Sequence, residues 1–148
     1  MEKYQYTIKH AHVLGKGVGI HSGLDATISL APAPSDTGIV FIRADLPGRP
    51  QIPAVCTNVV NTAYCTVLAS GNAKIHTVEH ILSAAVGAGI DNLYIEVDGP
   101  EVPIMDGSAD VFLFAMRIAG LAKQSDFRKY IKIKNTITIK DGDASASL

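Results

Sequence analysis

The amino-acid sequence predicts an α+β fold, and three observations support that prediction. Short runs of apolar or alternating apolar and polar residues recur along the chain, as is typical of β-strands. Two longer stretches, beginning near residues 77 and 108, have the spacing of apolar residues that helices show. The chain is 47% hydrophobic and 18% charged, so it can bury a core and is not disordered.

Length, charge and cysteine content exclude several classes of protein. The 148 residues suffice for one domain, or for one domain and the start of another. A net charge of -1 predicts no nucleic-acid or anionic-membrane partner. No run reaches the roughly 18 apolar residues of a membrane span, and the N-terminus lacks an apolar signal core. The two cysteines, Cys56 and Cys65, form no disulfide framework, so we expect a soluble cytoplasmic protein.

The strands are expected from alternation and from the turns between them. Tyr4, Tyr6 and Ile8 alternate with polar residues, which predicts a half-buried first strand with these three on its buried face. The glycine-rich stretch 15–23 has neither the G-x-G-x-x-G spacing of dinucleotide-binding loops nor the G-K-[ST] ending of a P-loop. We therefore expect a hairpin turn there. Further strands are expected at 24–30, 39–43, 62–69 and 92–97, and irregular chain at the proline-rich stretch 46–53.

The first helix is expected to begin with Thr77 as its N-cap and to end at Gly87 and Gly89. At about 100° per residue, one side of this helix is apolar and the opposite side is small and polar. The apolar stripe comprises Ile75, Val78, Leu82, Ala85 and Val86, and the polar side holds His80, Ser83 and Gly87. A histidine that points away from the core favours a functional site over a structural role.

A second helix is expected from Ser108, as N-cap, to Ala119, with Gly120 ending it. Its predicted buried stripe comprises Val111, Phe114, Ala115 and Ile118. Beyond it, a new strand pair is expected over residues 130–139, and Asp141-Gly142 is a hairpin-turn signal. These last elements cannot bury a face alone. We therefore expect a first domain at 1–126 and the start of a truncated second domain at 127–148.

The stretch His76-Thr77-Val78-Glu79-His80 is the strongest candidate for chemistry. Imidazole and carboxylate groups bind metals and activate a metal-bound water. A histidine at a helix start is more often a cap or a satisfied polar residue than a ligand, so this stretch alone is weak evidence. Other motifs of the chain strengthen it.

Four motifs occur together in order: Gly17–Gly23, Thr77–His80, Gly89–Asn92 and Pro103–Ala109. In these motifs the chain resembles the UDP-3-O-acyl-N-acetylglucosamine deacetylases, zinc enzymes of lipid A biosynthesis in Gram-negative bacteria. The resemblance runs from the N-terminus to about Asp143. It implies the first of two similar α+β domains, each a two-layer sandwich of a mixed β-sheet packed on two α-helices. The active site of the family lies between those domains.

The resemblance also implies roles for individual residues. His80 looks like a Zn²⁺ ligand, and Glu79 looks like the general base that takes a proton from the zinc-bound water. His21 matches a position in the active-site cleft, and Thr62, Cys65 and Asp106 match positions near the site, which suggests contact with the UDP-linked acylated glucosamine. The remaining ligands, a His and an Asp, and the His that protonates the leaving amine belong to the family's second domain. We therefore expect this chain alone to be an inactive fragment.

Two alternatives remain open. The stretch His76–His80 also matches the inverted zinc motif H-x-x-E-H of metallopeptidases, which requires both histidines on one face of one helix. The second alternative is a non-catalytic truncated domain, or a half-enzyme that pairs with a separate second domain. Without the family's second domain, the small polar face of the first helix and the outer side of Phe112 and Met116 would lack cover, so self-association is expected.

Overall fold

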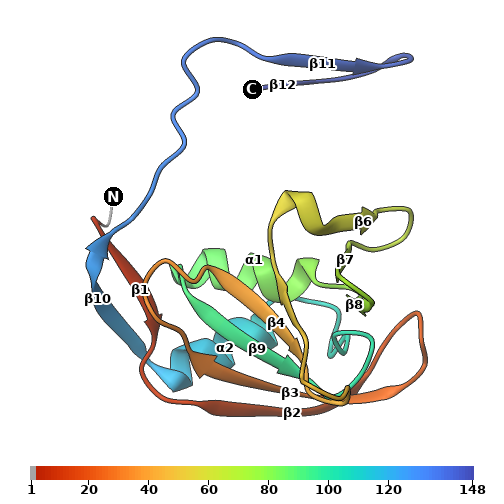
Figure 1. The fold of residues 1–148 in the computed structure, drawn as a ribbon, viewed down its shortest axis with the longest axis vertical. Helices are drawn as coiled ribbons and strands as arrows, with labels where there is room; N and C mark the ends of the chain where they lie inside the picture. The colour runs from red at the N-terminus through yellow and green to blue at the C-terminus, as the bar shows by residue number, and fades with distance from the viewer. Residues whose placement is uncertain (1–2) are drawn as a thin grey trace.

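A computed structural model describes residues 3–148, and a five-stranded mixed sheet is at its centre. In this sheet only β4 (Ile39–Arg43) and β9 (Leu93–Val97) run parallel; the other neighbouring strands are antiparallel. Helices α1 (Glu79–Ala88) and α2 (Asp110–Ala119) cover one face of this sheet (Figure 1). The predicted α+β fold, a sheet packed on helices, is confirmed. In spatial order the strands are β2 (His12–Val18), β3 (Asp25–Pro32), β9 (Leu93–Val97), β4 (Ile39–Arg43) and β5 (Gln51–Pro53).

Three smaller strand groups lie outside this sheet. The N-terminal strand β1 (Tyr4–Ile8) pairs antiparallel with β10 (Leu121–Phe127). A three-stranded sheet near the start of α1 comprises β6 (Val59–Asn61), β7 (Val67–Ser70) and β8 (Ala73–Ile75), preceded by the 3-10 helix η1 (Cys56–Asn58). A C-terminal hairpin comprises β11 (Thr138–Asp141) and β12 (Ala144–Ser147).

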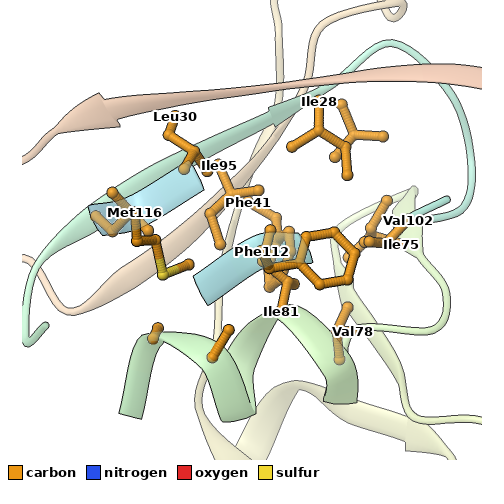
Figure 2. Close-up of a cluster of buried hydrophobic side chains, with 14 of the residues drawn as sticks. Ile28, Leu30, Phe41, Ile75, Val78, Ile81, Ile95, Val102, Phe112 and Met116 are labelled. Carbon is orange, nitrogen blue, oxygen red and sulfur yellow. The ribbon is translucent and has the colours of Figure 1, made fainter. Parts of the chain in front are cut away.

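The core lies between the sheet and the two helices. Phe112 of α2 lies among apolar side chains of both layers, and its exposed fraction is 0% (Figure 2). Burying one such side chain contributes about 1.5–3 kcal/mol. The other labelled side chains are Ile28, Leu30, Phe41, Ile75, Val78, Ile81, Ile95, Val102 and Met116. The same packing fixes the orientation of α1, which carries Glu79 and His80.

The buried face of β1 is not the predicted one. Gln5 and Thr7 are buried together with Ile8, whereas Tyr4 and Tyr6 are only partly buried. Burial of the polar residues is tolerated because they are hydrogen-bonded. The Gln5 side chain donates a hydrogen bond of 2.8 Å to the Asp36 carboxylate and accepts hydrogen bonds from the Asp36 backbone amide (2.9 Å) and the Asn92 side chain (2.7 Å). The Thr7 hydroxyl accepts one from the Ala33 amide.

The predicted stripe of the first helix is only partly correct. Ile75, Val78 and Ala85 are buried as expected, but Ile81 and Ala84 complete the buried face. Val86 is 79% exposed, because α1 packs against α2 with the side that carries Ile81, Ala84 and Ala85, and Val86 lies off that side. His80 and Ser83 do lie away from the buried side, and Gly89, with a φ of 73°, ends the helix as expected.

Thr77 is not the N-cap of α1. Val78 occupies that position, and no side chain caps the helix. Thr77 adopts a φ of 57°, and its hydroxyl donates a hydrogen bond of 2.7 Å to the carboxylate of Glu101. A charged acceptor forms a stronger hydrogen bond than a neutral one, so the hydroxyl bonds the carboxylate and is not a cap.

The predicted stripe of the second helix is wrong at two of its four positions. Phe112, Ala115, Met116 and Ala119 are buried, while Phe114 and Ile118 are 65% and 55% exposed. The expectation that Phe112 and Met116 point outward is therefore also wrong. The helix begins two residues after Ser108, whose hydroxyl accepts a hydrogen bond of 3.1 Å from the Asp110 amide.

Several strands differ from the predictions. The stretch 46–53 ends in an edge strand, β5, where a terminal proline is tolerated. Of the single strand expected at 62–69, only residues 67–69 lie in a strand, β7, whereas residues 62–66 form the loop that follows β6. Strands β2, β6, β8 and β10 were not predicted. The glycine-rich turn is confirmed: the Gly19 amide donates to the Leu24 carbonyl between β2 and β3.

The chain leaves the packed body after β10. An extended segment leads to the β11–β12 hairpin, which lies away from the body in Figure 1. Every residue from 131 to 148 is exposed, and the two strands pair only with each other. The predicted turn at Asp141-Gly142 is confirmed, with the register Asp141 opposite Ala144. No helix within residues 3–148 is long and apolar enough to cross a membrane.

Candidate active site

Glu79 is the first residue of α1 and is held beside the small β6–β7–β8 sheet. Its carboxylate accepts a hydrogen bond of 3.1 Å from the backbone amide of Thr66, which precedes β7. The N-terminal end of a helix carries a partial positive charge, which favours an ionised carboxylate there. The position of Glu79 is therefore fixed by both the helix and the loop that contains Cys65.

His80 follows Glu79 on the helix and is half-buried. Its neighbours Ile81 and Ala84 enter the core, so the His80 side chain lies on another side of the helix. The Ser83 hydroxyl donates a hydrogen bond of 2.8 Å to the His80 carbonyl, as serine often does within helices. A carboxylate and an imidazole thus project from consecutive positions of one rigid helix end.

Two small cavities, each of about 170 Å³, lie near this helix start and share His21 and His76. Cys65 lines the first cavity and Glu101 lines the second. The structure therefore brings together two predicted site residues, His21 and Cys65, with His76. The other lining residues are Asn61, Tyr64 and Val67 in the first cavity and Ser22 and Pro100 in the second.

The remaining two predicted substrate contacts lie elsewhere. Thr62 is exposed in the loop between β6 and β7 and lines neither cavity. Asp106 lines a different cavity of about 420 Å³, together with Lys16 and Met105. Its carboxylate accepts hydrogen bonds of 2.9 and 2.8 Å from the amide and the hydroxyl of Ser108, which lower the pKa of Asp106.

Sequence reasoning missed Glu101, which is 2% exposed and lies next to the site. Its carboxylate accepts hydrogen bonds from the amides of His21 (3.1 Å) and Ser22 (2.7 Å) and from the Thr77 hydroxyl (2.7 Å). Burial alone raises its pKa, but the hydrogen bonds from Ser22, Thr77 and His21 outweigh burial and lower the pKa of Glu101. A lone acid between Pro100 and the apolar Val102 was the available signal.

The donor groups fit one part of a catalytic zinc site. His80 offers one imidazole nitrogen, and Glu79 offers a base beside it, whereas catalytic zinc takes three protein ligands. Within residues 3–148, no three His, Cys, Asp or Glu side chains are grouped closely enough to hold a metal ion. His76 precedes the helix, and its backbone pairs with that of Glu101 in an isolated parallel β-bridge. His76 and His80 are therefore not paired on one helical face. This arrangement disfavours the inverted peptidase motif.

The chain is thus an α+β domain, a sheet packed on helices, with a carboxylate and an imidazole at consecutive positions of one helix start. Residues 5–148 match the family model described as LpxC, UDP-3-O-acyl N-acetylglycosamine deacetylase, and the chain belongs to this deacetylase family. It is 49% identical over 143 residues to the UDP-3-O-acyl-N-acetylglucosamine deacetylase of Pseudomonas entomophila (strain L48). That alignment covers 97% of this chain and 47% of the relative, so the chain spans about half of the relative's length.

Proposed function

We propose that this chain supplies the general base and one zinc ligand for hydrolysis of the N-acetyl group of UDP-3-O-(3-hydroxyacyl)-N-acetylglucosamine. The products are acetate and the free amine, and the reaction is the committed step of lipid A biosynthesis, carried out in the cytoplasm. The observation that carries the proposal is the Glu79–His80 pair at the start of α1. Glu79 accepts a hydrogen bond from the amide of Thr66, the neighbour of Cys65. Cys65 lines a cavity with His21, although Glu79 and His80 do not line that cavity themselves. Membership of the deacetylase family supports the choice of substrate.

Each residue has a specific task in this proposal. Zinc, when bound, polarises the amide carbonyl and lowers the pKa of a bound water to about 7 in favourable sites. His80 is one of the residues that hold the metal. The carboxylate of Glu79, held by the Thr66 amide, takes the proton of the attacking water as the new C–O bond forms. The C–N bond then breaks, and the leaving amine takes a proton from an acid that the resemblance places in a second domain.

The substrate contacts are proposed in two places. His21 and Cys65 lie in the cavity beside Glu79 and are proposed to contact the reacting end of the substrate. Asp106, and Thr62 in its exposed loop, are proposed to contact more distant parts of it, because neither lines that cavity. A UDP-linked acylated sugar is long enough to span separate contact points.

The 148-residue chain alone is proposed to be inactive. Among residues 3–148 no three possible ligands are grouped to hold a metal ion, whereas catalytic zinc takes three, and the acid that protonates the amine belongs, by the resemblance, to the family's second domain. Residues 1–126 are proposed as the first deacetylase domain and 127–148 as the start of the second. A non-catalytic domain, or a half-enzyme that needs a separate partner, is the alternative, and both predict the same inactivity for the isolated chain.

A chimera tests the proposed function. Residues 1–148 are joined to the part of the Pseudomonas entomophila relative that lies beyond the alignment. Acetate release from the substrate is then measured with zinc for the chimera and for the isolated chain. We expect turnover by the chimera only, and loss of about 10²–10⁴-fold in the Glu79→Gln chimera. The matched control is Ser83→Ala on the same helix, which should retain turnover. Turnover by the isolated chain, or full activity in Glu79→Gln, contradicts the proposal.

We propose that the isolated chain self-associates, but through exposed apolar residues other than Phe112 and Met116. Val86 on α1 and Phe114 and Ile118 on α2 are more than half exposed, and exposed apolar surface promotes association. Light scattering during size-exclusion chromatography should show a mass above the 15.6 kDa monomer at high concentration. Replacing Phe114 with Ser should shift the protein toward the monomer, and a wild-type monomer at all concentrations contradicts this proposal.

A further inference from the structure

Glu101 connects two parts of the site that are distant in sequence. Its carboxylate accepts hydrogen bonds from the amides of His21 and Ser22, in the turn after β2, and from the hydroxyl of Thr77, two residues before Glu79. The side chain is 2% exposed, and none of the ion pairs among residues 3–148 involves it. These hydrogen bonds are therefore the interactions that compensate for its burial.

Thr77 is held in an unfavourable backbone conformation. Its φ of 57° lies in the left-handed region, which is a genuine outlier for a β-branched residue. Such conformations persist where the surrounding structure imposes them, and they gather at functional sites. The hydrogen bond to Glu101 is the side-chain contact that holds Thr77, which directly precedes the first turn of α1.

Gly19 is required by the same carboxylate. A Cβ atom at this position would contact the carboxylate of Glu101 and the hydroxyl of Ser22 closely enough that one of them must shift. Its φ is not positive, so the absence of a side chain serves this close approach and not a left-handed turn. The turn that carries His21 is thus packed directly on Glu101.

We propose that Glu101 is a positioning residue, which fixes the start of α1 through Thr77 and the His21 turn through two backbone amides, so that Glu79, His80 and His21 keep one relative geometry. The inference rests on the proposed function of Glu79 and His80. Partners that orient metal ligands and bases from behind typically contribute 10–100-fold to affinity or activity. The carboxylate touches no reacting atom and acts only through the residues that it holds.

The first test uses the 148-residue chain itself and needs no activity. Backbone amide spectra are compared between wild type and Glu101→Gln, which keeps the shape but faces the donors with an NH₂ group. We expect shifts at His21 and Ser22 and also at Glu79 and His80. The matched control is Glu96→Gln on β9, an ion-pair partner of Arg49, which should leave those four amides unchanged. Shifts confined to residues 99–103 overturn the proposal.

The second test measures kinetics in the chimera. Thr77→Val removes the hydroxyl and Thr77→Ser keeps it, so this pair isolates the hydrogen bond and remains informative if Glu101→Gln does not fold. We expect kcat to fall roughly 10–100-fold in Glu101→Gln and in Thr77→Val, with KM nearly unchanged. Thr77→Ser should retain most of kcat. The double variant that combines Glu101→Gln with Thr77→Val should lose little more of kcat than Glu101→Gln alone.

The outcomes separate this inference from the proposed function. If the unsubstituted chimera is inactive, the proposed function fails and the amide spectra alone decide the role of Glu101. If the chimera is active, unchanged kcat in Glu101→Gln overturns the inference, as does an equal loss in Thr77→Ser and Thr77→Val. A purely structural role would lower the melting temperature and leave kcat of the folded enzyme unchanged.

Discussion

The packed body and the β11–β12 hairpin of this chain both contain antiparallel strand pairs, yet only the body has a core. In the body, Phe41 and Ile95 of the sheet are 0% exposed against the helices (Figure 2). In the hairpin, Ile139 is 69% exposed, and the strands contact only each other. A hairpin turn and two short strands suffice to define secondary structure, but stability requires a second layer.

The functional groups follow the same division. Glu79, His80, His21 and Glu101 all lie in the body, where buried hydrogen bonds and packed helices fix their positions. The hairpin contributes Lys140, Asp141 and Asp143, all exposed. A site that must hold a base within hydrogen-bond reach of a water needs the rigidity that only the body supplies.

The largest expected difference between the two regions concerns apolar truncation. Phe112→Ala should lower the free energy of unfolding by about 3–5 kcal/mol, because it empties a fully buried site. Ile139→Ala, in the hairpin, should change it by less than about 0.5 kcal/mol. Urea unfolding followed by circular dichroism measures both. A similar loss from Ile139→Ala shows that the hairpin packs on the body in solution.

The buried carboxylate of the body predicts a dependence of stability on pH. Because the folded state lowers the pKa of Glu101 below its ordinary 4.5, the contribution of Glu101 is complete above that value. It is lost as the pH falls from there through the lowered pKa of the folded state. Glu101→Gln should cost about 1–3 kcal/mol at pH 7 and make stability less steep between pH 5 and pH 3. Urea unfolding at a series of pH values measures this for wild type and Glu101→Gln. An equal loss of stability in the two proteins between pH 5 and pH 3 contradicts this role of Glu101.

Arg128 marks where the body ends and the extended segment begins. Its guanidinium donates hydrogen bonds of 2.7 Å to the Gly89 carbonyl, at the end of α1, and to the Asp91 carboxylate. Arg128→Ala should lower the free energy of unfolding by about 1–2 kcal/mol and speed amide exchange in β1 and β10. The matched control is Lys132→Ala in the exposed segment, which should have no measurable effect. Equal effects from both substitutions contradict the boundary at this position.

The smallest expected effects come from glycine substitutions of opposite sign. Gly87→Ala lies in α1, where an added Cβ meets no atom within 4 Å, so it should stabilise the body by about 0.5–1 kcal/mol. Gly142→Ala, at a φ of 56° in the hairpin turn, should weaken the hairpin without changing the body. Thermal unfolding measures the effect of Gly87→Ala, and amide exchange in β11 measures the effect of Gly142→Ala. A destabilising Gly87→Ala contradicts the exposed position of that face.

The positions of the helices were predictable from the sequence, but the buried side of α2 was not. Periodicity located both helices within two residues of their observed starts, because each combines apolar spacing with turn signals. However, apolar residues surround α2 almost completely, from Val111 to Ala119, so spacing alone could not select a face. Strand β10 was missed because Lys123, Gln124, Ser125 and Asp126 are polar, and its pairing with β1 joins opposite ends of the domain.

From the residues alone, members of the candidate site could be proposed only where they are neighbours in sequence, and His21 and Cys65 entered through the family resemblance. Glu79 and His80 stand side by side, so the motif revealed them directly. Glu101 was missed because its partners lie 24 and about 80 positions away, and only the folded chain brings them together. The same holds for the Thr66 amide that holds Glu79.

The most direct test of the account is the zinc content of the chimera and two of its histidine variants. The account makes His80 a ligand at the start of α1 and places His76 outside the helix, at the bridge to Glu101. Zinc bound after dialysis, measured by atomic absorption, should therefore be lost in His80→Ala and retained in His76→Ala. Equal loss of zinc from the two variants would contradict the account and favour the inverted peptidase motif.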